Sequence, residues 1–246
     1  MNEKQSPYFL AGMVVLSAAL VASAWLGAKA LGNLRSSDQT VSVTGSARKS
    51  IRSDFAIWRS SVGVESATQQ QAYAALQEHV KTIKNYFFQE KGIPAEALRL
   101  GAVQTSSLPE LLPNGNDSGK IRGYRLSQSF EIQLADVKKI ETLAQESGEL
   151  IQRGLPFDSY PPEYLYTRLS DLRVEMLSEA TKDARLRAEQ ILKSAGSHLG
   201  PVRAVRTGVF QITRPHSTEV SDSGLYDTGT IEKDITAVLT LSFAVD

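Results

Sequence analysis

The chain of 246 residues contains no cysteine. That absence excludes disulfide bonds, thiolate catalysis and zinc sites of the cysteine type. An excess of one charge is also missing, because Lys and Arg together number 27 and Asp and Glu together number 27. The sequence has no motif of clustered arginine and aromatic residues either, and we therefore expect no nucleic-acid partner.

Histidine is scarce, and His79, His198 and His216 lie far apart in the sequence without forming an HExxH pair. The serines lack a GxSxG elbow, and the glycines form neither a P-loop nor a dinucleotide-binding fingerprint. We interpret the histidines as lying on a helix flank, near a helix C-terminus and in a loop. We assign no catalytic, cofactor-binding or metal-ligating residue, expect no cofactor, and predict that the chain is not an enzyme.

Two stretches resemble functional motifs but lack their context. Leu225–Thr230 reads LYDTGT, similar to the aspartic-protease motif, and Asp117 is the one candidate for the second carboxylate that this chemistry requires. Both Asp117 and Asp227 lie in turn-forming sequence, which favours loops over a catalytic dyad. The stretch that begins at Asn114 resembles a calcium loop, but Arg125 stands where a bidentate glutamate is required.

The longest apolar stretch, residues 8–28, contains no charged residue and is long enough to cross a bilayer as a helix. Tyr8 and Trp25 lie near its ends, where interfacial aromatic residues are common. A cleaved signal peptide is the competing interpretation, supported by small-x-small sequences at 22–24 and 28–30. We favour an uncleaved anchor, because the apolar run exceeds the ~7–15 residues usual in a signal peptide.

The domain organisation follows from this anchor. We predict a short tail over 1–7, a transmembrane anchor over 8–31, a polar linker over 32–39 and one α+β domain over 40–246. With 41% hydrophobic residues, the chain can bury a substantial core. The few Lys and Arg residues that flank the span do not decide its orientation.

One long helical pattern organises the predicted domain, within the stretch 170–201. Ser170 is a candidate N-cap, Gly196 can end the helix in a left-handed turn, and Pro201 prevents its continuation. Small residues in the middle of its apolar stripe would let it lie close against a sheet. The predicted stripe consists of Leu172, Met176, Ala180, Ala184, Ala188, Ile191 and Ala195.

Strand and helix patterns alternate through the rest of the domain. Gly45 suggests a bend, and Trp58 lies on the polar side of its strand as either an exposed contact or a register slip. Pro161 and Pro162 must interrupt a strand ladder, so we expect an edge position or a bulge there. The predicted elements are strands near 41–43, 54–65, 98–107, 124–134, 157–166, 202–213 and 235–245, helices over 68–91 and from 136, and loops over 109–120 and 214–229. These patterns predict an α+β fold in which a transmembrane helix precedes antiparallel sheets packed against about three helices.

Several segments carry a family resemblance. They are VTGSARKSIRSDFAIWRSSVGVESATQQQAYAAL, GIPAEALRLGAVQTSSL, GYRLSQSFEIQL and above all LSEATKDARLRAEQILKSAGSHLGPV. On these segments the region 40–246 resembles the SIMPL domain family, a bacterial family of largely unassigned biochemical function. The resemblance implies an exported domain outside the cytoplasm, oligomeric assembly and a connection with envelope or oxidative stress, but no shared catalytic residues.

We therefore expect a single-pass protein of the cell inner membrane, with its globular domain in the periplasm. Its predicted role is non-enzymatic, through assembly into a homo-oligomer or binding of envelope proteins. Tyr160, Tyr164 and Tyr166 surround the two prolines as a stiff aromatic segment, which either binds a partner or packs a sheet margin. Two alternatives remain open: a hydrolase whose site is assembled from distant residues, and a carrier of a small molecule or peptide.

Overall fold

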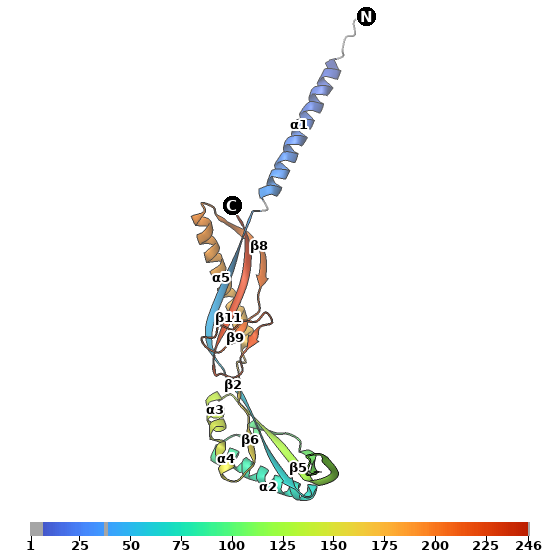
Figure 1. The fold of residues 1–246 in the computed structure, drawn as a ribbon. Coiled ribbons are helices and arrows are strands. Elements are labelled where there is room, and N and C mark those ends of the chain that lie inside the picture. Colours follow the sequence, from blue (N-terminus) through green and yellow to red (C-terminus); the bar gives the residue numbers. More distant parts are fainter. Residues whose placement is uncertain (1–6, 37–38, 246) are drawn as a thin grey trace. The chain divides into compact units, whose positions relative to one another are not determined.

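The structure is a computed structural model that describes residues 7–36 and 39–245, with side chains for 11–27 and 39–245. The chain divides into two compact units. Unit 1 contains the residues up to Ala47, Val174–Val209 and the residues from Ala237 on, while unit 2 contains Arg48–Arg173 and Phe210–Thr236. Three elements, β1, α5 and β11, contribute residues to both units (Figure 1). In chain order the elements are α1 (Pro7–Ser36), β1 (Thr40–Arg52), β2 (Phe55–Ser66), α2 (Gln69–Asn85), a π-helical turn (Tyr86–Glu90), a 3-10 turn (Ala95–Ala97), β3 (Leu98–Leu100), β4 (Gln104–Leu111), β5 (Asp117–Leu134), α3 (Val137–Glu146), α4 (Gly148–Gln152), β6 (Phe157–Ser159), β7 (Glu163–Leu165), α5 (Leu169–Ser194), β8 (Leu199–Thr207), β9 (Gln211–Thr213), β10 (Leu225–Tyr226) and β11 (Glu232–Val245).

The predicted N-terminal helix forms as α1. Within residues 11–27, its large apolar side chains are exposed on all sides, as Val14 and Val21 illustrate. Among the helices in the described part of the chain, none combines the length and apolarity that crossing a membrane requires. The transmembrane span predicted over 8–31 is therefore not found in the structure.

The fold class is α+β with antiparallel sheets, and four α-helices follow α1 in the described residues, one more than the three predicted. The additional helix is α4, which begins after Ser147, so the helical region predicted from 136 forms two helices. One strand pair departs from the antiparallel arrangement, because β9 and β10 pair in parallel. Both belong to a five-stranded sheet in which β11 also pairs with β1, β8 and β9.

In unit 1, α5 packs closely against β1 at Gly45. The predicted bend is wrong: Gly45 lies within the continuous strand β1, where a Cβ would fall 2.2 Å from the Ala180 carbonyl oxygen and 2.5 Å from the Ala184 nitrogen. The predicted close approach of helix and sheet is thus confirmed, and glycine is required because the helix backbone occupies the space of a side chain. On β1, the Ser42 hydroxyl lies 2.7 Å from that of Ser242 on β11.

The ends of α5 test the predicted helix signals. Gly196 adopts φ +76°, which confirms the left-handed turn after the helix. The helix begins at Leu169, so Ser170 lies in its first turn and is not the N-cap. Along unit 1 the buried row is Met176, Ala180, Ala184, Ala188 and Leu192, whereas the predicted Ile191 and Ala195 are exposed. The contact therefore follows one i±4 ridge of the helix to its end.

Unit 2 is built on the β2–β5 pair, whose register runs from Ala56↔Leu134 to Ser66↔Tyr124. Helix α2 starts where the sequence predicted a helix, and the Thr68 side chain caps it by accepting a hydrogen bond from the Gln71 N–H. Asp136 caps α3 in the same way through the Lys139 N–H. Both helices bury apolar side chains in the core of this unit. Figure 1 shows α2, α3 and α4 beside the strands of this unit.

Trp58 resolves the ambiguous register of β2. Its side chain is 0% exposed and its ring packs against Phe87 and Phe157. Ala56, Ser60 and Val62 are buried with it, so the even-numbered face of β2 is the core face without a slip. Trp58 is therefore not an exposed contact residue.

Two loop predictions need correction. Most of 109–120 belongs to a hairpin, since β4 extends to Leu111 and β5 starts at Asp117, with Gly115 at φ +84° in the turn. The sequence reads as a loop because Pro109 and the glycines conceal the strand pattern. In the predicted loop 214–229, Leu225 and Tyr226 form the short strand β10.

Candidate functional site

Unit 2 contains a cleft with a volume of about 790 Å³. Segments far apart in the sequence form its walls: the end of β1, helix α3, the connection between β6 and β7, and the loop before β11. This volume lies within the ~300–1,000 Å³ typical of binding pockets. The lining residues are Arg52, Lys138, Glu141, Ala144, Gln145, Ser159, Tyr160, Pro161, Pro162, Tyr164, Gly229, Thr230, Ile231 and Glu232.

The first wall is an interrupted sheet edge, one of the two arrangements that the sequence predicted for Pro161 and Pro162. β6 and β7 both pair with β2, with Ser159 opposite Ser60 and Glu163 opposite Ile57, and the two prolines lie between them. Proline cannot donate to a strand ladder, so the chain leaves the sheet here and returns. Tyr160 is 52% exposed at this point, whereas Tyr164 is buried. The aromatic segment thus both packs the sheet margin and presents an exposed ring.

The second wall is the loop Asp227–Glu232, which the Asp227 carboxylate organises. Its Oδ1 accepts the Gly229 N–H at 3.2 Å and its Oδ2 accepts the Thr230 N–H at 3.2 Å. The Thr230 hydroxyl also donates to Oδ2. Lys233 Nζ lies 3.1 Å from the same Oδ2 and donates to the Thr230 carbonyl. The Asp227 carboxylate therefore accepts from four donors, and these contacts close the loop.

Burial and pairing set the charges of this group. The Lys233 side chain is 0% exposed, and this burial lowers its pKa, which the Asp227 carboxylate only partly offsets. Burial alone would raise the pKa of Asp227, but the hydrogen bonds from Thr230 and Lys233 outweigh it and hold that pKa below its ordinary value. Asp227 is therefore ionised near neutral pH and serves as the counter-ion of a buried lysine.

Backbone hydrogen bonds tie the loop to its neighbours. The Ser53 N–H donates to the Ile231 carbonyl at 2.8 Å, and the Tyr164 N–H donates to the Thr228 carbonyl at 2.7 Å. The first bond links the loop to the β1–β2 connection and the second to β7. Both walls of the cleft are thus held in place without a ligand.

The rim of the cleft is charged but balanced. Arg52 lies 3.2 Å from Glu232, and Lys138 lies 2.6 Å from Glu141 one helical turn away. Exposed pairs of this kind contribute only ~0–1 kcal/mol to stability, so their charges remain available for a ligand. Deeper in the cleft, burial and the Glu141 carboxylate together raise the pKa of Tyr164, which stays a neutral phenol. The apolar part of the lining is formed by Ala144, Pro161, Pro162, Tyr164 and Ile231.

The hydroxyl groups of the cleft are poor nucleophiles. Ser159 Oγ accepts a hydrogen bond from Trp58 Nε1 at 3.2 Å, which uses it to satisfy a buried indole. Thr230 is within reach of a carboxylate, but a general base needs a pKa near the working pH, and that of Asp227 is held low. The arrangement is suited to binding and orientation, and nothing in it activates a hydroxyl.

The residues weighed from the sequence lie in different places. Asp117 accepts the Gly119 N–H at 2.7 Å in the β4–β5 hairpin, whereas Asp227 pairs with Lys233, so each carboxylate has a local structural role. His79 is half-buried on α2, and His216 lies in a loop at φ +62°. Within residues 11–27 and 39–245, no group of three or more metal-binding side chains gathers.

Sequence reasoning missed most of the cleft. Lys233 lies between two acidic residues at the start of an alternating strand, where the pattern suggests an exposed side chain. Arg52 and Glu141 belong to ordinary solvated faces. Only the tyrosine and proline segment carried a signal that pointed to this region.

A family model described as "SIMPL: Protein of unknown function (DUF541)" matches residues 41–243. The match includes both cleft walls and all of the sheet strands except for the outermost residues of β1 and β11. No curated protein matches the chain.

Proposed function

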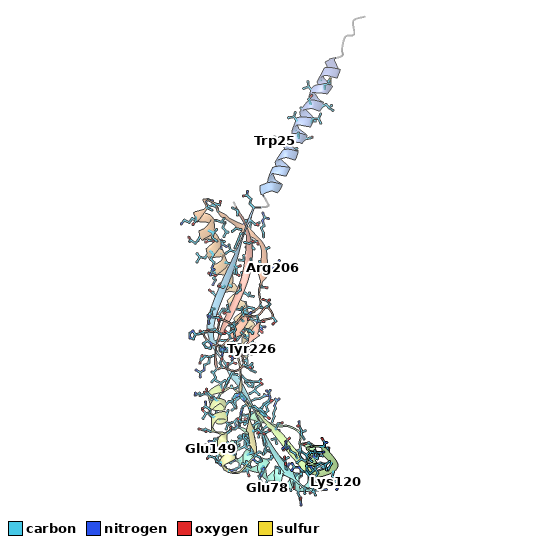
Figure 2. The ribbon with its side chains drawn as sticks, viewed as in Figure 1. Trp25, Glu78, Lys120, Glu149, Arg206 and Tyr226 are labelled. Atoms are coloured by element: carbon cyan, nitrogen blue, oxygen red, sulfur yellow. The ribbon has the colours of Figure 1, made fainter. Side chains whose placement is uncertain are left out.

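Because the chain belongs to the SIMPL family of proteins of unknown function, we propose for it a non-enzymatic role as a membrane-anchored domain whose cleft in unit 2 binds an extended segment of polypeptide. The observation that carries this proposal is the combination of five apolar or aromatic residues in the cleft lining, an exposed tyrosine beside two prolines and paired charges of both signs. Figure 2 shows the side chains of this unit, with Glu149 on α4 and Tyr226 on β10 labelled.

An extended polypeptide fits these features. Tyrosine and proline surfaces bind peptides with little loss of conformational entropy, because they are rigid before binding. Rim charges of both signs, from Arg52, Glu232, Lys138 and Glu141, favour a ligand with mixed charge over a strongly anionic or cationic one. A small-molecule carrier remains the second candidate, because the volume of about 790 Å³ also suits a small ligand.

The anchor is proposed from the sequence together with α1. Residues 8–28 carry no charge, and the described apolar side chains of α1 lie exposed around the helix. A helix that is apolar on all faces needs lipid or protein around it. The SIMPL resemblance then supports an inner-membrane protein with its domain in the periplasm, partners among envelope proteins, assembly with further copies, and a role in envelope or oxidative stress tolerance.

Hydrogen-exchange footprinting tests the binding proposal. The full-length protein in detergent is mixed with a library of unstructured peptides and, separately, with a set of small metabolites. We expect peptides to slow amide exchange in residues 157–165 and 227–233, because both segments line the cleft. Protection of these segments by the metabolites alone would favour the carrier, and protection elsewhere only would refute a site in this cleft.

A further inference from the structure

The second unusual feature of unit 2 is the hairpin arm, which we define as residues 108–122 of β4, β5 and their turn. Nearly every residue of this arm is exposed, and Leu111, Leu112 and Ile121 are 61%, 45% and 57% exposed at its tip. An isolated two-stranded hairpin is marginally stable in water. An arm that ends in three large apolar side chains therefore gains stability when another surface covers its tip.

The arm is nevertheless well defined at its base and turn. Gly123 is buried, and a Cβ there would fall 2.7 Å from the Ser66 carbonyl oxygen, so the base of the arm lies tightly against β2. At the turn, the Leu112 N–H donates to the Asn116 carbonyl at 2.8 Å. Because of these contacts the arm is already a folded hairpin, and it does not need to fold when it binds.

The tip of the arm can contact a partner through its side chains but not by backbone strand pairing along β4. Pro109 lies in β4, opposite Ile121, and proline on an edge strand prevents the addition of another strand. Pairing of β4 with a foreign strand is therefore blocked at the tip. The exposed groups that remain are the three apolar side chains and the charges that flank them, Glu110, Asp117, Lys120 and Arg122.

We propose that the tip of the arm docks into the cleft of a second copy of this chain, a proposal that rests on the binding role of the cleft. The apolar tip matches the apolar part of the cleft lining, Ala144, Pro161, Pro162, Tyr164 and Ile231. Acidic Glu110 and Asp117 can meet Arg52 and Lys138 at the rim, while basic Lys120 and Arg122 can meet Glu232 and Glu141. The formal net charge of the chain is +0, so copies approach without long-range repulsion.

This contact joins two different surfaces of the same chain. None of the arm residues 108–122 lines the cleft. Each copy would offer one tip and one cleft, so two copies can exchange tips in a closed dimer, or the contact can continue from copy to copy until a ring closes. In either case we expect an assembly of defined order, fixed by the geometry of the contact.

Disulfide trapping tests this contact directly, because the chain contains no cysteine of its own. Full-length L112C carrying one affinity tag is mixed in detergent with Q145C, at an exposed position of the cleft lining, carrying another, and mild oxidant is added. We expect at least about tenfold more mixed disulfide than in the control pair of L112C with Y73C, since Tyr73 is 51% exposed on α2 and lies outside the cleft. Equal yields in the two pairs would overturn the docking proposal.

A second measurement separates this proposal from the function on which it rests. The double variant L111D/L112D should lower the mass of the assembly in light scattering while peptide protection of residues 157–165 is retained. An unchanged mass would overturn the arm as the docking element even if the cleft binds peptides. Absence of peptide protection in the double variant, in which no tip competes for the cleft, would instead refute the proposed function itself.

Discussion

Lys233 Nζ lies 3.1 Å from Asp227 Oδ2, and the lysine side chain is completely buried while the aspartate is 25% exposed. This ion pair connects the first residues of β11 with the loop that forms one wall of the cleft. Removal of one partner leaves the other charge without compensation, whereas the intact pair fixes the loop before any ligand arrives. The shape of the cleft therefore depends on this ion pair, although a ligand in the cleft would not contact Lys233.

Asp227→Asn should destabilise the protein by about 3 kcal/mol, because it leaves the buried Lys233 ammonium without its counter-ion. Urea denaturation followed by circular dichroism measures the loss. Glu179→Gln is the control, since the Lys182–Glu179 pair is exposed on α5 and its removal should change little. Similar effects of the two substitutions would show that the buried pair does not stabilise the fold.

The stability of the protein should fall in acid, because the pKa values of Asp227 and Asp234 are held below their ordinary value of 3.8. For Asp234 the causes are hydrogen bonds from Ser50 and Arg48, which outweigh burial. A lowered pKa in the folded state contributes stability above the unfolded value and loses it as the pH falls through the folded value. Melting temperatures from about pH 6 down to pH 2 should decline, and less steeply in Asp227→Asn. An equal slope in that variant would contradict the assignment.

Gly45→Ala should destabilise the protein by about 1–3 kcal/mol, since the new methyl group would overlap the α5 backbone at Ala180 and Ala184. The matched control is Gly148→Ala, where nothing lies within 4 Å of the added atom. That substitution should be neutral or slightly stabilising. Thermal melts of the two variants compare them, and a tolerated alanine at position 45 would refute the tight helix-to-strand contact.

Deletion of residues 2–31 should release the protein from the membrane, because the uncharged run 8–28 is the proposed anchor. The measurement is extraction of bacterial membranes with alkaline carbonate, which strips peripheral proteins only. The full chain should stay in the pellet, and a phosphatase that is active only outside the cytoplasm, fused after Asp246, should be active. Release of the full chain by carbonate, or an inactive fusion, would refute the proposed topology.

Local signals predicted much of the fold. Thr68 and Asp136 identified helix starts, Gly196 identified a helix end, and Pro161 with Pro162 identified an interrupted edge, because each acts through its own backbone or side chain. Gly45 and Trp58 were misread or left ambiguous for the opposite reason. The role of Gly45 is set by a helix more than a hundred residues further along the chain, and the side of β2 that is buried is set by Phe87 and Phe157.

The cleft could not be predicted in the same way. Its walls come from the end of β1, α3, the β6–β7 connection and the loop before β11, and no spacing in the sequence relates these segments. The sequence around Lys233 suggests a solvated residue, but in the structure the Asp227 loop covers its side chain. Tyr160 was recognised because its chemistry stands out locally, beside two prolines.

The most direct test of the central claim is the affinity of the cleft for a bound peptide in two matched variants. Tyr160 and Tyr73 are 52% and 51% exposed, and only Tyr160 lines the cleft. Fluorescence anisotropy with a labelled peptide selected from the library gives the dissociation constant of each full-length variant. Tyr160→Ala should weaken binding by about tenfold, as expected for an aromatic anchor, while Tyr73→Ala should bind as the unaltered protein does. Equal affinities in the two variants would contradict a polypeptide-binding site in this cleft.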